Sequence, residues 1–96
     1  MTIMIYDQAG AFAENKDIAR RIRIEQIMPA ITKGEVVQLN FTGVTGVTQS
    51  FMHALLAELI RTYGDDVYDQ VLFINCTPLV QEIVNIVADY MQESVL

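Results

Sequence analysis

Apolar residues recur every three or four positions in three stretches of the chain, which is the spacing of amphipathic helices. The first stretch begins after Asn15, a good N-cap residue, and we expect Pro29 to end or bend that helix near its last turn. The second stretch runs from Ser50 to Tyr63 and is closed by Gly64. Thr77 caps the third, which has proline at its first position and a wide apolar face. That face comprises Leu79, Val80, Ile83, Val84, Ile86, Val87, Tyr90 and Met91.

Short apolar runs between these helices predict strands. The run at 71–74 is continuous and too short for a helix, so we expect a fully buried strand there. Residues 35–41 are apolar enough to form a second buried strand. At the N-terminus, residues 2–6 are rich in β-formers, and Gly10 separates them from a short run at 11–13, which predicts a hairpin.

Strands and helices alternate along the chain, and this order predicts the fold class. A strand, a helix and a second strand in succession form a crossover unit, which requires parallel strands. We therefore predict a single α/β domain over residues 1–96, with a mainly parallel mixed sheet of four to five strands and about three helices packed on it. The N-terminal segment is expected to add one or two antiparallel strands.

Net charge limits the possible partners, and the N-terminal residues and cysteine content indicate the cellular compartment. Twelve acidic and six basic residues give the 96-residue chain a formal charge of −6, which repels nucleic acids and anionic membranes, so we predict neither as a partner. The first residues carry no basic leader, so we expect no signal peptide and a cytoplasmic protein. The single cysteine, Cys76, fits a reducing compartment.

Four of the six basic residues lie within eight positions of each other. They are Lys16, Arg20, Arg21 and Arg23. The cluster has two interpretations, a grip on an acidic partner or phosphate, or a solvated face that Asp17 and Glu25 offset.

Loops at the carboxyl ends of parallel strands are where such sheets meet ligands and partners. The first of these loops leads to Ser50, where a phosphate would face free backbone amides and the positive end of the helix dipole. Ser50, Gln49 or Thr48 could equally be a plain N-cap. The loop lacks the spacing of a nucleotide-binding turn, and we expect Gly43 and Gly46 simply to allow positive φ.

Two other functions stay open. Cys76 precedes a helix N-terminus and His53 lies in the first turn of the preceding helix, so the two could form the nucleophile and base of a small enzyme. Against this, no orienting acid is evident, and a lone cysteine beside a strand is commonly a buried hydrophobe. The other function is a structural homo-oligomer subunit, with a homodimer as one form. One histidine and one cysteine cannot build a Cys/His zinc site, and we predict no metal or cofactor.

Three segments resemble the STAS-like family of uncharacterised bacterial domains. They are Val-Gln-Leu-Asn-Phe-Thr-Gly-Val at 37–44, Val-Thr-Gln-Ser-Phe at 47–51 and Leu-Phe-Ile-Asn at 72–75. That family is similar to the anti-sigma-factor antagonists, in which a partner kinase of the histidine-kinase-like ATPase fold phosphorylates a serine or threonine at a helix start. The resemblance places Ser50 at the phosphoacceptor position. It implies a non-enzymatic regulatory protein that binds this ATP-binding partner until phosphate breaks the interface.

The chain departs from the antagonist pattern at several positions. Asn40 replaces the acid that usually follows the strand, Thr48 replaces the acid two residues before the acceptor, and Phe51 stands in place of a small glycine. STAS-like relatives often have an acidic pair soon after the Ser-Phe dipeptide, where this chain has His53 and Ala54. These differences weigh against phosphorylation and predict a different partner specificity.

We predict a partner-binding surface on the loop before the second helix, on the exposed side of that helix and at the end of the last strand. It comprises Thr42, Gly43, Thr45, Gly46, Thr48, Gln49, Ser50, His53 and Asn75. A Ser50→Asp change is expected to weaken partner binding without unfolding the domain.

Overall fold

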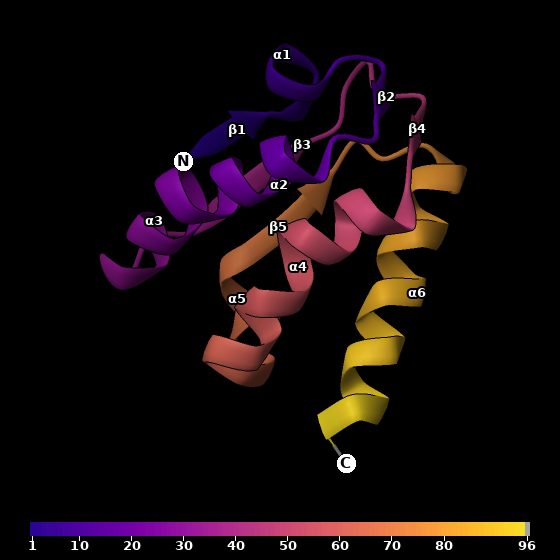
Figure 1. Cartoon of the computed structure of the whole chain (residues 1–96). Helices are drawn as coiled ribbons and strands as arrows, with labels where there is room; N and C mark the ends of the chain where they lie inside the picture. Colours follow the sequence, from indigo (N-terminus) through magenta and orange to yellow (C-terminus); the bar gives the residue numbers. More distant parts are fainter. Residues whose placement is uncertain (96) are drawn as a thin grey trace.

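The strands form two small parallel sheets in the computed structural model, which describes residues 1–95 and the side chains of residues 1–92 (Figure 1). The larger sheet has the order β1-β3-β5 and comprises β1 (Thr2–Met4), β3 (Val37–Asn40) and β5 (Val71–Ile74). The smaller sheet pairs β2 (Phe12–Ala13) with β4 (Gly46–Val47). The strand predicted at 71–74 is therefore confirmed, and the one predicted at 35–41 is shorter than expected.

The predicted arrangement of the N-terminal segment is wrong. β1 pairs parallel to β3, with Thr2 opposite Gln38, and β2 pairs parallel to β4, so neither strand is antiparallel. A hairpin cannot form because a short helix, α1 (Ile5–Ala9), separates the two strands and carries the chain away from β1. The single mixed sheet of four to five strands is consequently replaced by two parallel sheets.

Helices account for most of the remaining chain. The first helical region consists of α2 (Lys16–Ile22), the π-helical turn η1 (Arg23–Ile27) and α3 (Met28–Thr32). It is followed by α4 (Gln49–Tyr63), the 3₁₀ turn η2 (Gly64–Asp66), α5 (Val67–Gln70) and α6 (Pro78–Val95). The long helix α4 begins and ends close to the predicted positions, and α6 begins at Pro78 as predicted.

The first helical region starts as predicted and passes Pro29 without ending. The Asn15 side chain caps it by accepting hydrogen bonds from the backbone N–H groups of Asp17 and Ile18, at 2.9 and 3.3 Å. Met28 then donates its N–H to the carbonyl of Arg23, five residues earlier, which widens the turn. Pro29 thus falls in the first turn of α3, where its missing N–H is least costly.

The core lies between the larger sheet and the helices α2 and α4, which cover one face of that sheet, and α6 packs beside them against α4 and β4 (Figure 1). The strands place alternate residues in this core, and Leu39 of β3 is fully buried there. Residues on the other face are more exposed, and Leu72 keeps 39% of its surface in contact with solvent. The expectation of a fully buried strand at 71–74 is wrong, because Leu72 is exposed and Phe73 and Ile74 are half-buried. Among the described residues, no helix covers the face that carries Leu72 (Figure 1).

α6 buries only part of its apolar face. Val80, Val84, Val87 and Met91 are buried, and the helix packs against α4 and β4. The other positions of the predicted apolar face include Leu79, Ile86 and Tyr90, which are 66%, 41% and 56% exposed. They remain exposed because α6 lies at the edge of the molecule, with neighbours on one side (Figure 1). No helix within the described residues is long and apolar enough to cross a lipid bilayer.

Candidate functional site

Asn40 organises the carboxyl ends of β3 and β5. Its side-chain oxygen Oδ1 accepts hydrogen bonds from the backbone N–H of Thr42 at 2.9 Å, from Thr42 Oγ1 at 2.6 Å and from Asn75 Nδ2 at 3.2 Å. Asn75 adopts a positive φ of 57°, which asparagine tolerates better than most residues. The neutral amide at position 40 therefore holds two of the predicted surface residues, Thr42 and Asn75, in one hydrogen-bonded group.

The loop between β3 and α4 is held by the N-terminal segment. The carbonyl of Ala11 accepts hydrogen bonds from the N–H of Thr45 at 2.8 Å, from the N–H of Gly46 at 3.3 Å and from Thr45 Oγ1 at 3.2 Å. The carbonyl of Ala13 accepts from the N–H of Thr48 at 3.0 Å. These backbone amides are therefore already paired within the chain and do not form a cradle for a phosphate.

Aromatic rings from the N-terminal segment lie close to the two glycines of this loop. Gly43 has φ of 87°, as predicted, and a Cβ there would be 3.0 Å from a ring carbon of Tyr6. The prediction for Gly46 is wrong, because its φ is not positive. A Cβ at Gly46 would lie 2.9 Å from a ring carbon of Phe12, so the glycine is needed for close packing instead.

Thr48 is the N-cap of α4, and this leaves the Ser50 hydroxyl outside the cap. Thr48 Oγ1 accepts a hydrogen bond from the backbone N–H of Phe51 at 3.1 Å. Phe51 is fully buried and fixes the start of the helix in the core. Ser50, at the second helical position, is exposed. Of the three capping residues considered from sequence, Thr48 is the one used.

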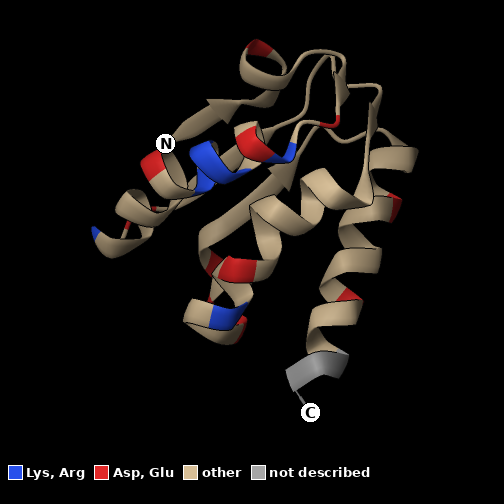
Figure 2. Ribbon diagram, viewed as in Figure 1, with Lys and Arg blue, Asp and Glu red and all other residues tan. Residues whose placement is uncertain are grey.

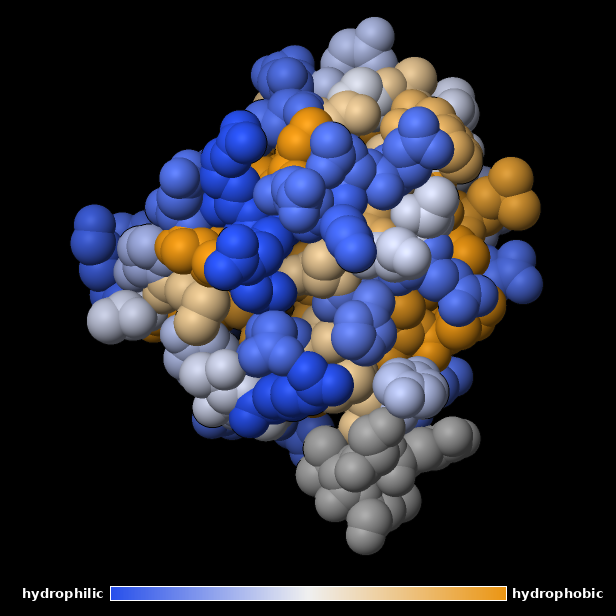
Figure 3. All heavy atoms as spheres, viewed as in Figure 1, coloured by the Kyte–Doolittle hydropathy of each residue, from blue (hydrophilic) through white to orange (hydrophobic). Residues whose placement is uncertain are grey.

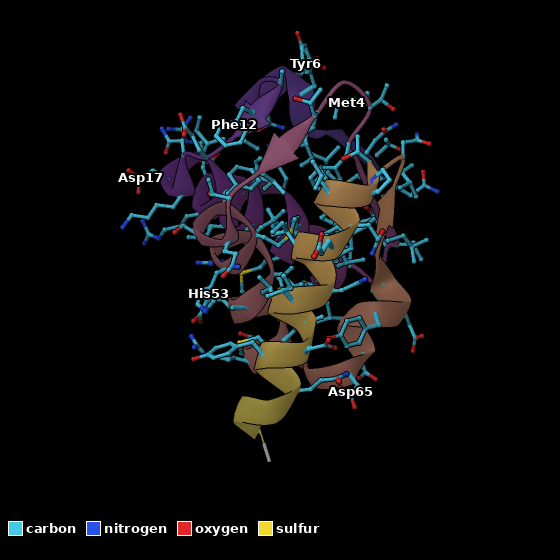
Figure 4. The ribbon with its side chains drawn as sticks, turned by 90° about the vertical axis from the view of Figure 1, so that its right-hand side faces the viewer. Met4, Tyr6, Phe12, Asp17, His53 and Asp65 are labelled. Carbon is cyan, nitrogen blue, oxygen red and sulfur yellow. The ribbon has the colours of Figure 1, made fainter. Side chains whose placement is uncertain are left out.

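A pocket of about 460 Å³ lies between α4 and α6, with the start of α2 at its edge. Its lining comprises Lys16, Gln49, Ser50, His53, Ala54, Ile86, Val87 and Tyr90. His53 of α4 faces Tyr90 of α6, with ring centroids 6.3 Å apart and planes inclined by 56°. Figure 4 shows His53 beside α6. The polar lining therefore comes mainly from α4, and the apolar lining mainly from α6.

The predicted binding surface divides into separate groups. Gln49, Ser50 and His53 line the pocket, and Thr48 caps the helix beside them. Thr42 and Asn75 belong to the group around Asn40. The other loop residues, Gly43, Thr45 and Gly46, contact the N-terminal segment.

The four residues of the basic cluster lie in three different surroundings. Arg23 Nη1 donates a hydrogen bond of 2.6 Å to the backbone carbonyl of Ala54, so this arginine ties η1 to α4. Arg20 and Arg21 line a second depression on the α2 side of the molecule, together with acidic Asp17 and Glu25, which supports the solvated-face interpretation for these two arginines. Lys16 lines the pocket beside Ser50.

Cys76, which follows β5, is half-buried. Burial raises its pKa, which favours the neutral thiol over the reactive thiolate. Its sulfur lies 4.0 Å from the carbonyl oxygen of Ile74, and Cys76 is not among the residues that line the pocket containing His53. Within the described residues, no group of three His, Cys, Asp or Glu side chains could hold a metal ion.

Five pocket residues were not predicted as parts of the binding surface: Lys16, Ala54, Ile86, Val87 and Tyr90. Lys16 was predicted in the basic cluster, Ala54 was noted only as a departure from the family pattern, and the other three were predicted on the apolar face of the third helix. The sequence signal that could have predicted them is the pair of long apolar stripes on α4 and α6. Two such stripes must pack together, and the residues along their edges then face each other.

Comparison with known proteins identifies the family. The sequence profile of the STAS-like domain of unknown function (DUF4325) matches residues 19–81, which include α4 and β5 and extend into the first turn of α6. No curated protein and no solved structure gives a significant match. The matched region covers more than half of the 96 residues and contains the segments whose resemblance was noted from sequence. The chain belongs to the STAS-like family of domains of unknown function.

Proposed function

We propose that this domain is a non-enzymatic, cytoplasmic regulatory module that binds another protein, and that phosphorylation of Ser50 controls the binding. The observation that carries the proposal is that Ser50 is exposed at the start of α4 while Thr48 provides the cap. The hydroxyl can therefore be modified without loss of the hydrogen bond that starts the helix. Family membership supports the choice of this position, because the related antagonists are phosphorylated at a helix start.

A phosphate at Ser50 would be tolerated by the fold. At the second position of a helix it lies near the positive end of the helix dipole, where an anion stabilises the helix by roughly 0.3–1 kcal/mol. Lys16 lines the same pocket and supplies a positive charge near that group. The main effect of phosphate would therefore be on the surface presented to a partner, through added charge and bulk.

The partner proposed by family resemblance is an ATP-binding protein of the histidine-kinase-like ATPase fold. In the transfer, Ser50 Oγ forms a bond to the γ-phosphorus of ATP and the bond from that phosphorus to the bridging oxygen breaks. The hydroxyl proton passes to a base of the kinase, and ADP leaves. The partner supplies ATP and the base, so this chain needs to present only its hydroxyl.

Capture from source-cell lysate tests the proposal with three forms of the protein. The wild type is compared with Ser50→Asp and with Thr62→Asp, which adds the same charge at an exposed position near the other end of α4. We expect the wild type and Thr62→Asp to capture the same ATP-binding protein, and Ser50→Asp to lose it. Equal capture by all three forms would contradict control at Ser50.

Direct modification is a second, independent test. The captured partner is incubated with the protein and ATP, and phosphopeptides are mapped by mass spectrometry. We expect phosphate on the peptide that contains Ser50 and none in Ser50→Ala. Phosphate on another residue, or none at all, would contradict the assignment of Ser50.

A further inference from the structure

α6 carries an exposed line of apolar side chains with the spacing of a coiled-coil seam. Leu79, Ile83, Ile86 and Tyr90, called the α6 stripe below, are separated by four, three and four residues. Leu79, Ile86 and Tyr90 are exposed, and Ile83 is half-buried. Residues at this spacing lie on one side of a helix. In Figure 3, hydrophobic surface gathers on the right, over α6.

The two flanks of the α6 stripe differ. Val80 and Val87, which follow Leu79 and Ile86, are buried against the rest of the molecule. Glu82 and Asp89, which precede Ile83 and Tyr90, are exposed. In heptad terms Ile83 and Tyr90 take the a positions, Leu79 and Ile86 the d positions, and the two acids the g positions. One flank is therefore used by the fold, and the other presents negative charge.

Positive charge is absent from this helix. Residues 78–95 include no lysine or arginine, and Figure 2 shows acidic residues along α6 without basic ones. A second copy of the chain packed along the α6 stripe would bring no base to Glu82 or Asp89, and an antiparallel arrangement would place like charges opposite each other. The charges on this surface therefore disfavour a homodimer and favour a basic partner.

We propose that the α6 stripe is a docking site for an amphipathic helix of another protein, with apolar residues at its a and d positions and lysine or arginine at the positions that face Glu82 and Asp89. This rests on the proposed binding function and deepens it by naming the kind of segment that the partner presents, and it does not depend on phosphorylation. Ile86 and Tyr90 also line the pocket that contains Ser50, so the docked helix would lie beside that residue.

A designed helix provides the probe. It has three heptads with leucine at a and d, lysine at e and g, and an intramolecular staple that keeps it helical. One comparison peptide carries glutamate at e and g, and another has the same composition as the lysine peptide in scrambled order. We expect the lysine peptide to bind with a Kd in the micromolar range, and the two comparison peptides to bind at least about tenfold more weakly. Amide chemical shifts should move along α6.

Variants locate the binding. Ile86→Glu places an unpaired charge in the interface and should weaken binding by about tenfold or more. Val36→Glu is the matched control, because Val36 is exposed to a similar extent, 46%, but precedes β3. This control should leave the Kd unchanged.

Charge reversal tests the choice of a basic partner without disturbing apolar contacts. Glu82→Lys with Asp89→Lys should weaken binding of the lysine peptide by roughly threefold to tenfold and strengthen binding of the glutamate peptide. Asp65→Lys with Asp69→Lys makes the same change in net charge at exposed positions outside α6, and it should have little effect.

Three results would overturn the proposal. The first is no binding of the lysine peptide, and the second is an equal loss of binding in both charge-reversed proteins, which would mean attraction to net charge alone. The third is a dimer in light scattering that Ile86→Glu dissociates, since a second copy would then occupy the stripe. None of these results bears on Ser50. Equal capture of the partner by the wild type and Ser50→Asp would contradict control at Ser50 and would leave the peptide result intact.

Discussion

The helices α4 and α6 begin with the same arrangement of residues. Thr48 Oγ1 accepts from the N–H of Phe51 at 3.1 Å, and Thr77 Oγ1 accepts from the N–H of Val80 at 3.2 Å. In both helices the residue that donates to the cap is fully buried. Each helix thus starts with a threonine cap followed, three residues later, by an anchor in the core.

The difference lies at the second helical position, between the cap and the anchor. That position is Ser50 in α4 and Leu79 in α6, and both residues are exposed. Because the cap and the anchor hold the backbone in each case, the exposed residue is free to serve another purpose. One helix presents a hydroxyl, and the other presents an apolar side chain that is 66% exposed. Two helices that begin with the same cap and anchor can therefore expose different chemical groups at the second helical position.

The largest expected effect is the loss of an anchor. Phe51→Ala should lower the free energy of unfolding by about 3–5 kcal/mol, and Val80→Ala by about 2 kcal/mol. The cost is smaller at Val80 because truncating valine to alanine removes fewer buried apolar atoms than truncating phenylalanine. Urea denaturation measures both. A cost below about 1 kcal/mol for Phe51→Ala would mean that this residue does not fix the start of α4.

Loss of a cap should lower the free energy of unfolding by less than loss of an anchor does, and by about the same amount in both helices. Thr48→Ala and Thr77→Ala are each expected to cost about 1 kcal/mol in urea denaturation, because each removes the acceptor for one orphan N–H. Thr→Ser at the same positions keeps the oxygen and serves as the control. A clear inequality between the two alanine variants would break the equivalence of the two helix starts.

The exposed positions should hardly affect stability. Ser50→Asp and Leu79→Asp are each expected to change the free energy of unfolding by less than about 0.5 kcal/mol, since a carboxylate in the first turn interacts favourably with the helix dipole. Thr62→Asp, in the last turn of α4, should destabilise slightly by the opposite interaction. If Ser50→Asp cost more than about 1 kcal/mol, the hydroxyl would have a structural role.

The smallest expected effect is a pH dependence at the start of α6. Burial raises the pKa of Cys76, so above the unfolded pKa of about 8.5 the unfolded chain releases a proton that the folded chain keeps, and stability falls as pH rises. Urea midpoints between pH 8 and 10 should fall slightly more for the wild type than for Cys76→Ser. Tyr68, whose pKa burial also raises, adds to the loss nearer pH 10 in both proteins.

The reaction of Cys76 with iodoacetamide sharpens the same point. Near neutral pH it should be slower in the folded protein than in urea, and His53→Ala should leave the rate unchanged. A fast reaction that depends on His53 would support the enzyme alternative.

Local signals predicted the helix starts well. Asn15, Thr48 and Thr77 are caps in the structure. They could be predicted because a capping side chain bonds to a backbone N–H only two or three positions away. The continuous run at 71–74 is short enough that only a strand suits it. The candidate Ser50 was found the same way, from its place at the start of a periodic segment.

Features set by distant contacts were not predicted. The parallel pairing of Thr2 with Gln38 joins residues far apart in sequence, and nothing within residues 2–13 specifies it. The need for glycine at position 46 depends on the ring of Phe12. The exposure of Ile86 depends on how many sides of α6 are covered, and periodicity gives only the spacing of its apolar residues.

The bonds from the Ala11 carbonyl to Thr45 and Gly46 have a consequence for the order of folding. They join residues about 34 positions apart, and closing a loop of that length costs about 3 kcal/mol of chain entropy beyond a constant. Helices, whose contacts are local, can form before such pairings. The loop that precedes Ser50 should therefore acquire its structure late, and the amides of Thr45 and Thr48 should become protected from hydrogen exchange after those in the middle of α4 during refolding.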